Sequence, residues 1–202
     1  MRLVVAATGA SGAIYTQRLL DNLTGHEVHY IASRHAREVQ QLELGAAASV
    51  ADSSAGSRRD GGHYTGLRIP DGVTVYDEDD SMSAPFVSGS ALFDAMVIIP
   101  ASMGTIGRIA NGVSDTTIAR AADVFLKERR KLILVPREAP YNLIHLRNMA
   151  RLTEAGATII PASPSFYSLP RTIPELVDTI IARVLDHLGI VHHLVSRWPS
   201  AT

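Results

Sequence analysis

Five short apolar runs, which alternate with stretches of helical periodicity, constrain the fold more than any other feature of the 202-residue sequence. They are rich in β-branched residues, too short for helices, and cover residues 2–7, 27–32, 95–100, 131–136 and 157–161. Helical patterns cover residues 13–23, 34–43, 103–110, 115–127, 142–155 and 173–188. Apolar strands that alternate with helices predict a mostly parallel sheet covered on both faces. We therefore expect one α/β domain, a doubly wound three-layer sandwich over residues 1–202.

Each predicted strand ends in small, polar or charged residues. The five endings read TGASG, SRH, PASMGT, PREAP and PASPSFY. In doubly wound sheets, ligands bind outside the carboxyl ends of the strands. We expect a ligand site where these five loops converge.

The loop from Thr8 to Ala13, TGASGA, has the composition of an anion site between a strand and a helix. Glycine permits positive φ and close approach to backbone N–H groups, and a helix N-terminus attracts phosphate. The motif alone is weak, because it is neither a Walker loop nor a full G-x-G-x-x-G. A second loop of small donors, at Ser102, Gly104 and Thr105, supports a phosphate ligand, as does Ser33 after the second strand.

Two groups of charged residues are candidates for chemistry. Arg120, Asp123 and Lys127 share one helix face, although a solvated face explains them equally well, and residues 128–130 look solvated. Arg137 and Glu138 stand between two prolines after an apolar strand, where stability requires neither charge.

The remaining composition mainly excludes functions. A formal net charge of −1 provides no general field for nucleic acid or an anionic membrane, and the absence of cysteine excludes thiolate chemistry. No signal or membrane-spanning pattern is present, which predicts a cytoplasmic protein. Residues 45–90 look like a variable surface excursion, in which the acidic run 77–80 is a solvated loop and not a metal site, and residues 190–202 look like a C-terminal tail.

Taken together, these segments resemble the flavin prenyltransferases of the UbiX type. The resemblance covers nearly the whole chain except residues 45–85, and it rests on TGASGAIYTQRLL, SGS at 88–90, PASMGT, RAADVFLKERRKLILVPREAPYNLIHLRNM and GATIIPASPSFYSLP.

The resemblance implies a flavodoxin/Rossmann-like fold that binds reduced FMN and joins a dimethylallyl group to its ring nitrogen five and carbon six. The product, prenylated FMN, serves UbiD-type decarboxylases. The implied donor is dimethylallyl monophosphate, no metal is needed, and the implied assembly is a homo-oligomer, commonly a dodecamer, with sites between subunits.

The resemblance also assigns roles to individual residues. The implied FMN-binding residues are Gly9, Ala10, Ser11, Ser33, Ser102, Met103, Gly104, Thr105, Arg120 and Arg137. The implied donor-binding residues are Ser88, Gly89, Ser90, Lys127, Tyr167 and Arg183. The implied catalytic residues are Glu43, Lys127, Glu138 and Trp198. Cations beside the phosphate would stabilise the leaving group, Trp198 would shelter an allylic cation, and the two glutamates would move protons.

Two other functions remain open at this point. A cysteine decarboxylase of related fold would carry a histidine near the first helix, where this chain has Gln17 and Arg18. A plain FMN electron carrier would not need a second cluster such as Lys127, Tyr167, Arg183 and Glu138, and would leave it facing solvent. The sequence does not distinguish a monophosphate from a diphosphate donor, and Met103 and the segment around Ser81 depart from the family pattern.

Overall fold

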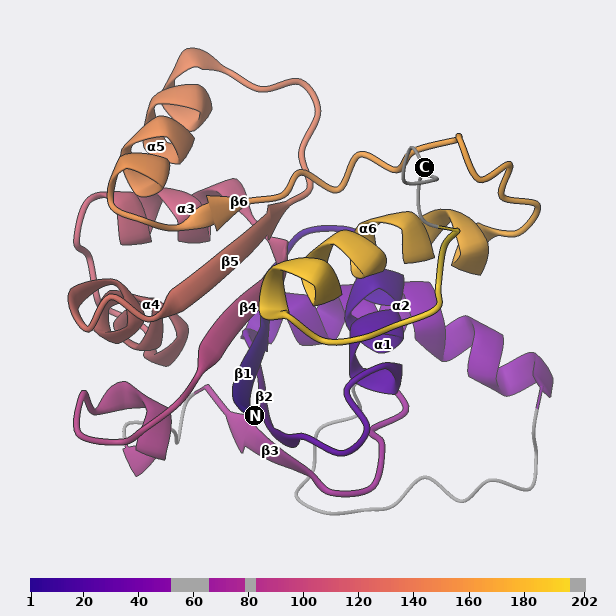
Figure 1. The fold of residues 1–202 in the computed structure, drawn as a ribbon, viewed down its shortest axis with the longest axis horizontal. Coiled ribbons are helices and arrows are strands. Elements are labelled where there is room, and N and C mark those ends of the chain that lie inside the picture. The colour runs from indigo at the N-terminus through magenta and orange to yellow at the C-terminus, as the bar shows by residue number, and fades with distance from the viewer. Residues whose placement is uncertain (52–65, 79–82, 197–202) are drawn as a thin grey trace, which may run out of the picture.

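A six-stranded, all-parallel sheet forms the centre of the molecule (Figure 1). The computed structural model describes residues 1–51, 66–78 and 83–196. Its strands are β1 (Arg2–Ala7), β2 (Glu27–Ala32), β3 (Val73–Asp77), β4 (Ala95–Ala101), β5 (Lys131–Pro136) and β6 (Thr158–Ile159), in the order β3-β2-β1-β4-β5-β6.

Helices cover both faces of the sheet, which confirms the predicted doubly wound sandwich (Figure 1). One face carries α1 (Ala13–Asp21), α2 (Arg34–Ala51) and α6 (Ile173–Leu188). The other carries α3 (Met103–Ala110), α4 (Thr117–Lys127), α5 (Leu143–Glu154) and the short 3-10 helix η2 (Pro85–Val87). No helix in the described ranges is both long enough and apolar enough to cross a membrane.

Alternation along the strands divides the core into two layers. In β1, Leu3 and Val5 pack with α1 and α6, while Val4 and Ala6 pack with α3 and α4. All four side chains are at most 1% exposed. Because both faces of the central strands are buried, these strands are continuously apolar, and this is why the sequence revealed them.

The strand order reverses between β1 and β4. Both strands pair in parallel, with Leu3 of β1 opposite Ala95 of β4 and Val28 of β2. The chain leaves β1 toward one face of the sheet and β4 toward the other, and this is the position at which doubly wound sheets bind ligands. The fold therefore places the two predicted glycine-containing loops beside each other at the carboxyl edge.

Several predicted boundaries are wrong. The surface excursion predicted over 45–90 contains β3 and η2, and Phe86 within it is only 1% exposed. The second helix continues to Ala51, well past its predicted end at residue 43. The last strand has two residues where five were expected. In the predicted tail, Ile190 and Leu194 pack against the core beside α1 and α6.

Candidate functional site

Thr8 fastens the loop after β1 to the loop after β4. Its backbone N–H and its hydroxyl each donate to the Pro100 carbonyl at 3.1 Å, and its hydroxyl accepts the Ser102 N–H at 2.7 Å. The Thr8 side chain is buried. The two loops therefore form one rigid unit at the point where the strand order reverses.

The glycine loop turns into α1 with its N–H groups directed at a carboxylate. Gly12 has φ of 116°, a conformation that favours glycine. The Glu43 carboxylate of α2 accepts the N–H groups of Gly12 at 2.9 Å and Ala13 at 2.7 Å. Gly9 permits close packing of α2, since a Cβ there would lie 2.6 Å from the His35 Cβ. The loop therefore fixes the predicted catalytic Glu43 at the carboxyl edge.

A cation contacts the same loop from β5. The Arg137 Nε donates to the Ser11 carbonyl at 3.1 Å, and Arg137 is half-buried. Nearby, burial raises the pKa of Tyr15 against the opposing effect of the Arg137 charge. Glu138, the next residue, is exposed and accepts the Ala139 N–H at 3.0 Å. Backbone groups thus hold the side chains of two successive residues, one cation and one anion, at this edge.

The predicted serines cap helices at strand ends. The Ser102 hydroxyl accepts the Thr105 N–H at 3.3 Å and contacts the Thr105 hydroxyl at 3.1 Å, which starts α3. The Ser33 hydroxyl accepts the Ala36 N–H at 3.2 Å at the start of α2. Met103 is buried, whereas Gly104 is exposed. Amide, hydroxyl and guanidinium donors therefore gather at the carboxyl edge, a donor set that suits a phosphate ester such as FMN.

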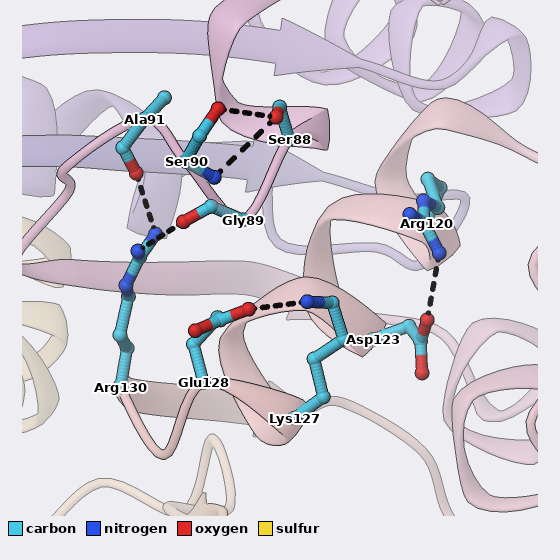
Figure 2. A network of polar contacts seen from close by, with 9 residues as sticks. All are labelled: Ser88, Gly89, Ser90, Ala91, Arg120, Asp123, Lys127, Glu128 and Arg130. Atoms are coloured by element: carbon cyan, nitrogen blue, oxygen red, sulfur yellow. Dashed lines mark hydrogen bonds and ion pairs between the residues drawn. The ribbon is translucent and has the colours of Figure 1, made fainter.

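A second group of predicted residues lies at the opposite edge of the sheet. Residues 88–91 precede β4 and residues 127–130 precede β5, so both segments lie at the amino ends of these parallel neighbours. Figure 2 shows the Lys127 ammonium beside this loop and paired with Glu128. A Cβ on Gly89 would lie 2.8 Å from the Lys127 Nζ. The Ser88 and Ser90 hydroxyls contact each other at 2.9 Å.

The remaining candidates are dispersed within one chain. Arg120 pairs with Asp123 at 3.0 Å, and Figure 2 shows it apart from the Ser88–Ala91 loop. Arg183 lies on α6, across the sheet from α4, and pairs with Asp186 at 3.4 Å. Tyr167 follows β6 and is 87% exposed. Trp198 lies outside the described residues. Lys127 and Arg183 therefore lie on helices that cover opposite faces of the sheet in one chain.

Comparison with known proteins identifies the family of this chain. The family model described as "Flavoprotein" matches residues 1–196. A flavin prenyltransferase UbiX from Thermoplasma acidophilum is 44% identical over 198 residues, which cover 98% of this chain and 100% of that protein. The chain belongs to the UbiX family of flavin prenyltransferases.

Solved structures of UbiX proteins share the fold over nearly the entire chain. AnUbiX in complex with FMN and dimethylallyl pyrophosphate is 36% identical with a TM-score of 0.84, and the match covers 100% of this chain and 98% of that one. A dodecameric FMN-dependent UbiX-like decarboxylase from Escherichia coli O157:H7 is also 36% identical, with a TM-score of 0.81 and coverage of 99% and 100%.

In this UbiX-family chain, the residues at the position of the alternative histidine serve the fold. Gln17 donates to the Arg68 carbonyl at 2.9 Å. Arg18 forms a bidentate pair with Asp178 of α6, at 2.8 and 2.7 Å. These contacts, together with the family match, favour the prenyltransferase family over the cysteine decarboxylase interpretation.

Two residues of the UbiX-family site region were missed by sequence reasoning. Thr8 stands at the start of the glycine loop, and a hydroxyl at the end of a central strand was the available signal. Arg130 was assigned to solvent, yet it donates to the Gly89 and Ala91 carbonyls at 2.6 Å each. Its partners are about 40 residues away in the chain, so no local pattern could have identified it.

Two further features of the structure concern metal binding and the predicted acidic run. Across 1–51, 66–78 and 83–196 no group of three or more histidine, cysteine or carboxylate residues is arranged to hold a metal ion. In the predicted acidic run, Asp77 pairs with Arg37 at 2.8 Å, while Asp79 and Asp80 fall outside the described ranges.

Proposed function

We propose that this protein joins a dimethylallyl group from dimethylallyl monophosphate to nitrogen five and carbon six of reduced FMN, and releases phosphate. The product, prenylated FMN, would serve a UbiD-type decarboxylase in the cytoplasm. The observation that carries the proposal is the distribution of the candidate residues over the two edges of the sheet. Hydrogen-bond donors for FMN, among them Arg137 and Ser102, lie at one edge. The lysine–serine cluster, which consists of Lys127, Ser88 and Ser90, lies at the other.

The two edges have different roles. Reduced FMN supplies the electron-rich ring nitrogen and carbon that form the new bonds. Arg137 and the Ser102 and Thr105 hydroxyls would bind its phosphate and orient the ring at the carboxyl edge. Lys127 and the Ser88 hydroxyl would bind the donor phosphate and stabilise its growing charge as the allylic C–O bond breaks.

The proposed reaction is balanced in protons and needs no external oxidant or reductant. Two bonds form on FMN and displace one proton from nitrogen five and one from carbon six. One proton enters the alkene carbon of the five-carbon unit, and the other leaves with the phosphate. Glu43, held by the Gly12 and Ala13 N–H groups, would accept a proton at the flavin. Glu138 would pass one to the phosphate.

Because the two groups lie at opposite edges, a complete site requires more than one copy of the chain. We propose a homo-oligomer, a dodecamer like that of the E. coli relative, in which the lysine–serine cluster of one copy meets the flavin edge of another. Tyr167 and Arg183 would also contact the donor phosphate, and Trp198 would complete the prenyl pocket. The assembly would cover apolar side chains that are exposed in one chain, among them Phe166 and Ile144.

The electron-carrier alternative also has an observation in its favour. Lys127 is 46% exposed and Arg183 is 63% exposed in a single chain, as expected if neither binds a donor. The identity to prenyltransferases over the full chain outweighs this, since an interfacial site also leaves both residues exposed before assembly.

The test is anaerobic incubation of the purified oligomer with reduced FMN and dimethylallyl monophosphate, followed by mass analysis of the released flavin. We expect a gain of one five-carbon unit. Tightly bound but unmodified FMN would contradict the proposal and support the carrier. A parallel reaction with the diphosphate donor determines the donor class.

A further inference from the structure

We propose that Arg130 is a positioning residue of the donor-phosphate subsite. It holds the Ser88–Ala91 loop so that the Ser88 hydroxyl and the Lys127 ammonium face one ligand. This inference rests on the proposed function.

The end of α4 directs Arg130 toward the loop. Arg129 has φ of 53°, the left-handed conformation that often ends helices, and the Arg130 N–H donates to the Phe125 carbonyl at 2.8 Å. This turn reverses the chain immediately after Lys127 and Glu128. Arg130 consequently lies between α4 and β5, with its side chain pointing at the segment that precedes β4 (Figure 2).

The guanidinium then binds two carbonyls of one short loop. Its two terminal nitrogens donate to Gly89 and Ala91, each at 2.6 Å, and the contacts are partly buried. A rigid planar fork satisfies two acceptors at once, which a single ammonium does less well. A charged donor to a neutral carbonyl is also stronger than a neutral one. Arg130 therefore fixes the loop from the β5 side.

On its other side, the loop packs against the residue that would bind phosphate. The Gly89 backbone lies close to the Lys127 and Glu128 side chains, because a Cβ there would lie 2.8 Å from the Lys127 Nζ and closer still to a Glu128 carboxylate oxygen. The loop therefore lies between the Arg130 guanidinium, which binds its carbonyls, and the ends of the Lys127 and Glu128 side chains. With the loop held by Arg130, the Ser88 hydroxyl keeps its place relative to Lys127.

The test measures binding of dimethylallyl monophosphate to the assembled protein loaded with oxidised FMN, which lacks the nucleophilic reduced ring and cannot turn over. Arg130→Met removes the fork and leaves an unbranched apolar side chain. We expect its Kd for the donor to rise roughly tenfold, the order of one charge-assisted hydrogen bond. FMN affinity and oligomer size should stay at wild-type values. Arg130→Lys should restore part of the donor affinity.

Arg68→Ala is the matched control, because Arg68 is an exposed arginine of the loop before β3 that pairs with Asp21. The same loss of charge there should leave the donor Kd unchanged. If Arg130→Met does not assemble, Arg130→Gln, a polar side chain without the charge or the fork, takes its place and should raise the donor Kd in the same direction. A wild-type donor Kd in either assembled variant overturns the inference. Failure of the wild-type protein to bind the donor refutes the proposed function, and the inference with it.

Discussion

At the residue scale, the glycine loop shows how far local sequence determines a site. The TGASGA motif predicts a turn with free N–H donors, and Gly12 does adopt the required positive φ. The acceptor of those donors could not be predicted, because Glu43 is about 30 residues away on α2. The same holds for Arg137, which reaches Ser11 from β5. Motifs predicted the loop, whereas the fold determined which charges contact it.

Substitution of Gly12 by alanine should destabilise the fold in two ways, through the strained backbone conformation and through a steric clash with Tyr15. A Cβ would lie 2.9 Å from the Tyr15 Cδ2, and φ of 116° is strained for alanine. We expect the free energy of unfolding in urea to fall by about 2 kcal/mol or more. Gly25→Ala is the control, since Gly25 also has positive φ, of 83°, but nothing lies within 4 Å of its Cβ position. Equal losses in both variants would show that the Tyr15 contact is unimportant.

At the element scale, the contact between α1 and α6 includes a partly buried ion pair. The Asp178 side chain is 9% exposed and receives two hydrogen bonds from Arg18. Arg18→Met should lower the free energy of unfolding by about 3 kcal/mol, because it leaves a buried carboxylate without a partner. The double variant Arg18→Met, Asp178→Leu should recover most of the loss. Chemical denaturation of both variants measures this, and a double variant no more stable than the single one would contradict the account.

Elements were predictable where both faces of a strand are buried. Four strands of the central sheet read as apolar runs for that reason. The edge strand β3 was missed because Thr74 and Val75 are exposed, which leaves no continuous apolar run. Phe86 gave no signal either, since it is a single aromatic residue in a polar segment. The role of Arg130 could not be predicted either, because its two partners are backbone carbonyls, which every residue type carries.

At the scale of the whole molecule, burial of tyrosines predicts a decline of stability in alkali. Burial raises the pKa values of Tyr15, Tyr30, Tyr76 and Tyr141. Above pH 10 the unfolded chain loses phenolic protons that the folded chain keeps, so the unfolding free energy is fully present below pH 10 and falls as pH rises further.

Tyr30 should make the clearest contribution to this loss of stability in alkali. Its side chain is fully buried, and its hydroxyl accepts a hydrogen bond from the Gln40 side-chain amide at 2.7 Å. We expect Tyr30→Phe to reduce the slope of unfolding free energy against pH by up to about 1.4 kcal/mol per pH unit above pH 10. Urea denaturation from pH 9 to pH 11 measures the slope, independently of any uniform loss of stability in the variant. An unchanged slope would show that Tyr30 ionises alike in both states.

The two half-sites that we propose lie at opposite edges of one sheet. The proposed flavin half comprises the loops after β1 and β4, and the proposed donor half comprises the segments before β4 and β5. A function that uses both halves requires association of several chains. It also predicts that loss of the donor half leaves the flavin half intact.

The measurement that tests this account most directly compares the flavin released from wild-type and Lys127→Met protein after anaerobic reaction with reduced FMN and dimethylallyl monophosphate. The account predicts prenylated FMN from the wild type, and FMN bound in equal amount but unmodified from the variant. Prenylation by Lys127→Met at the wild-type rate would contradict it, as would loss of FMN binding in that variant.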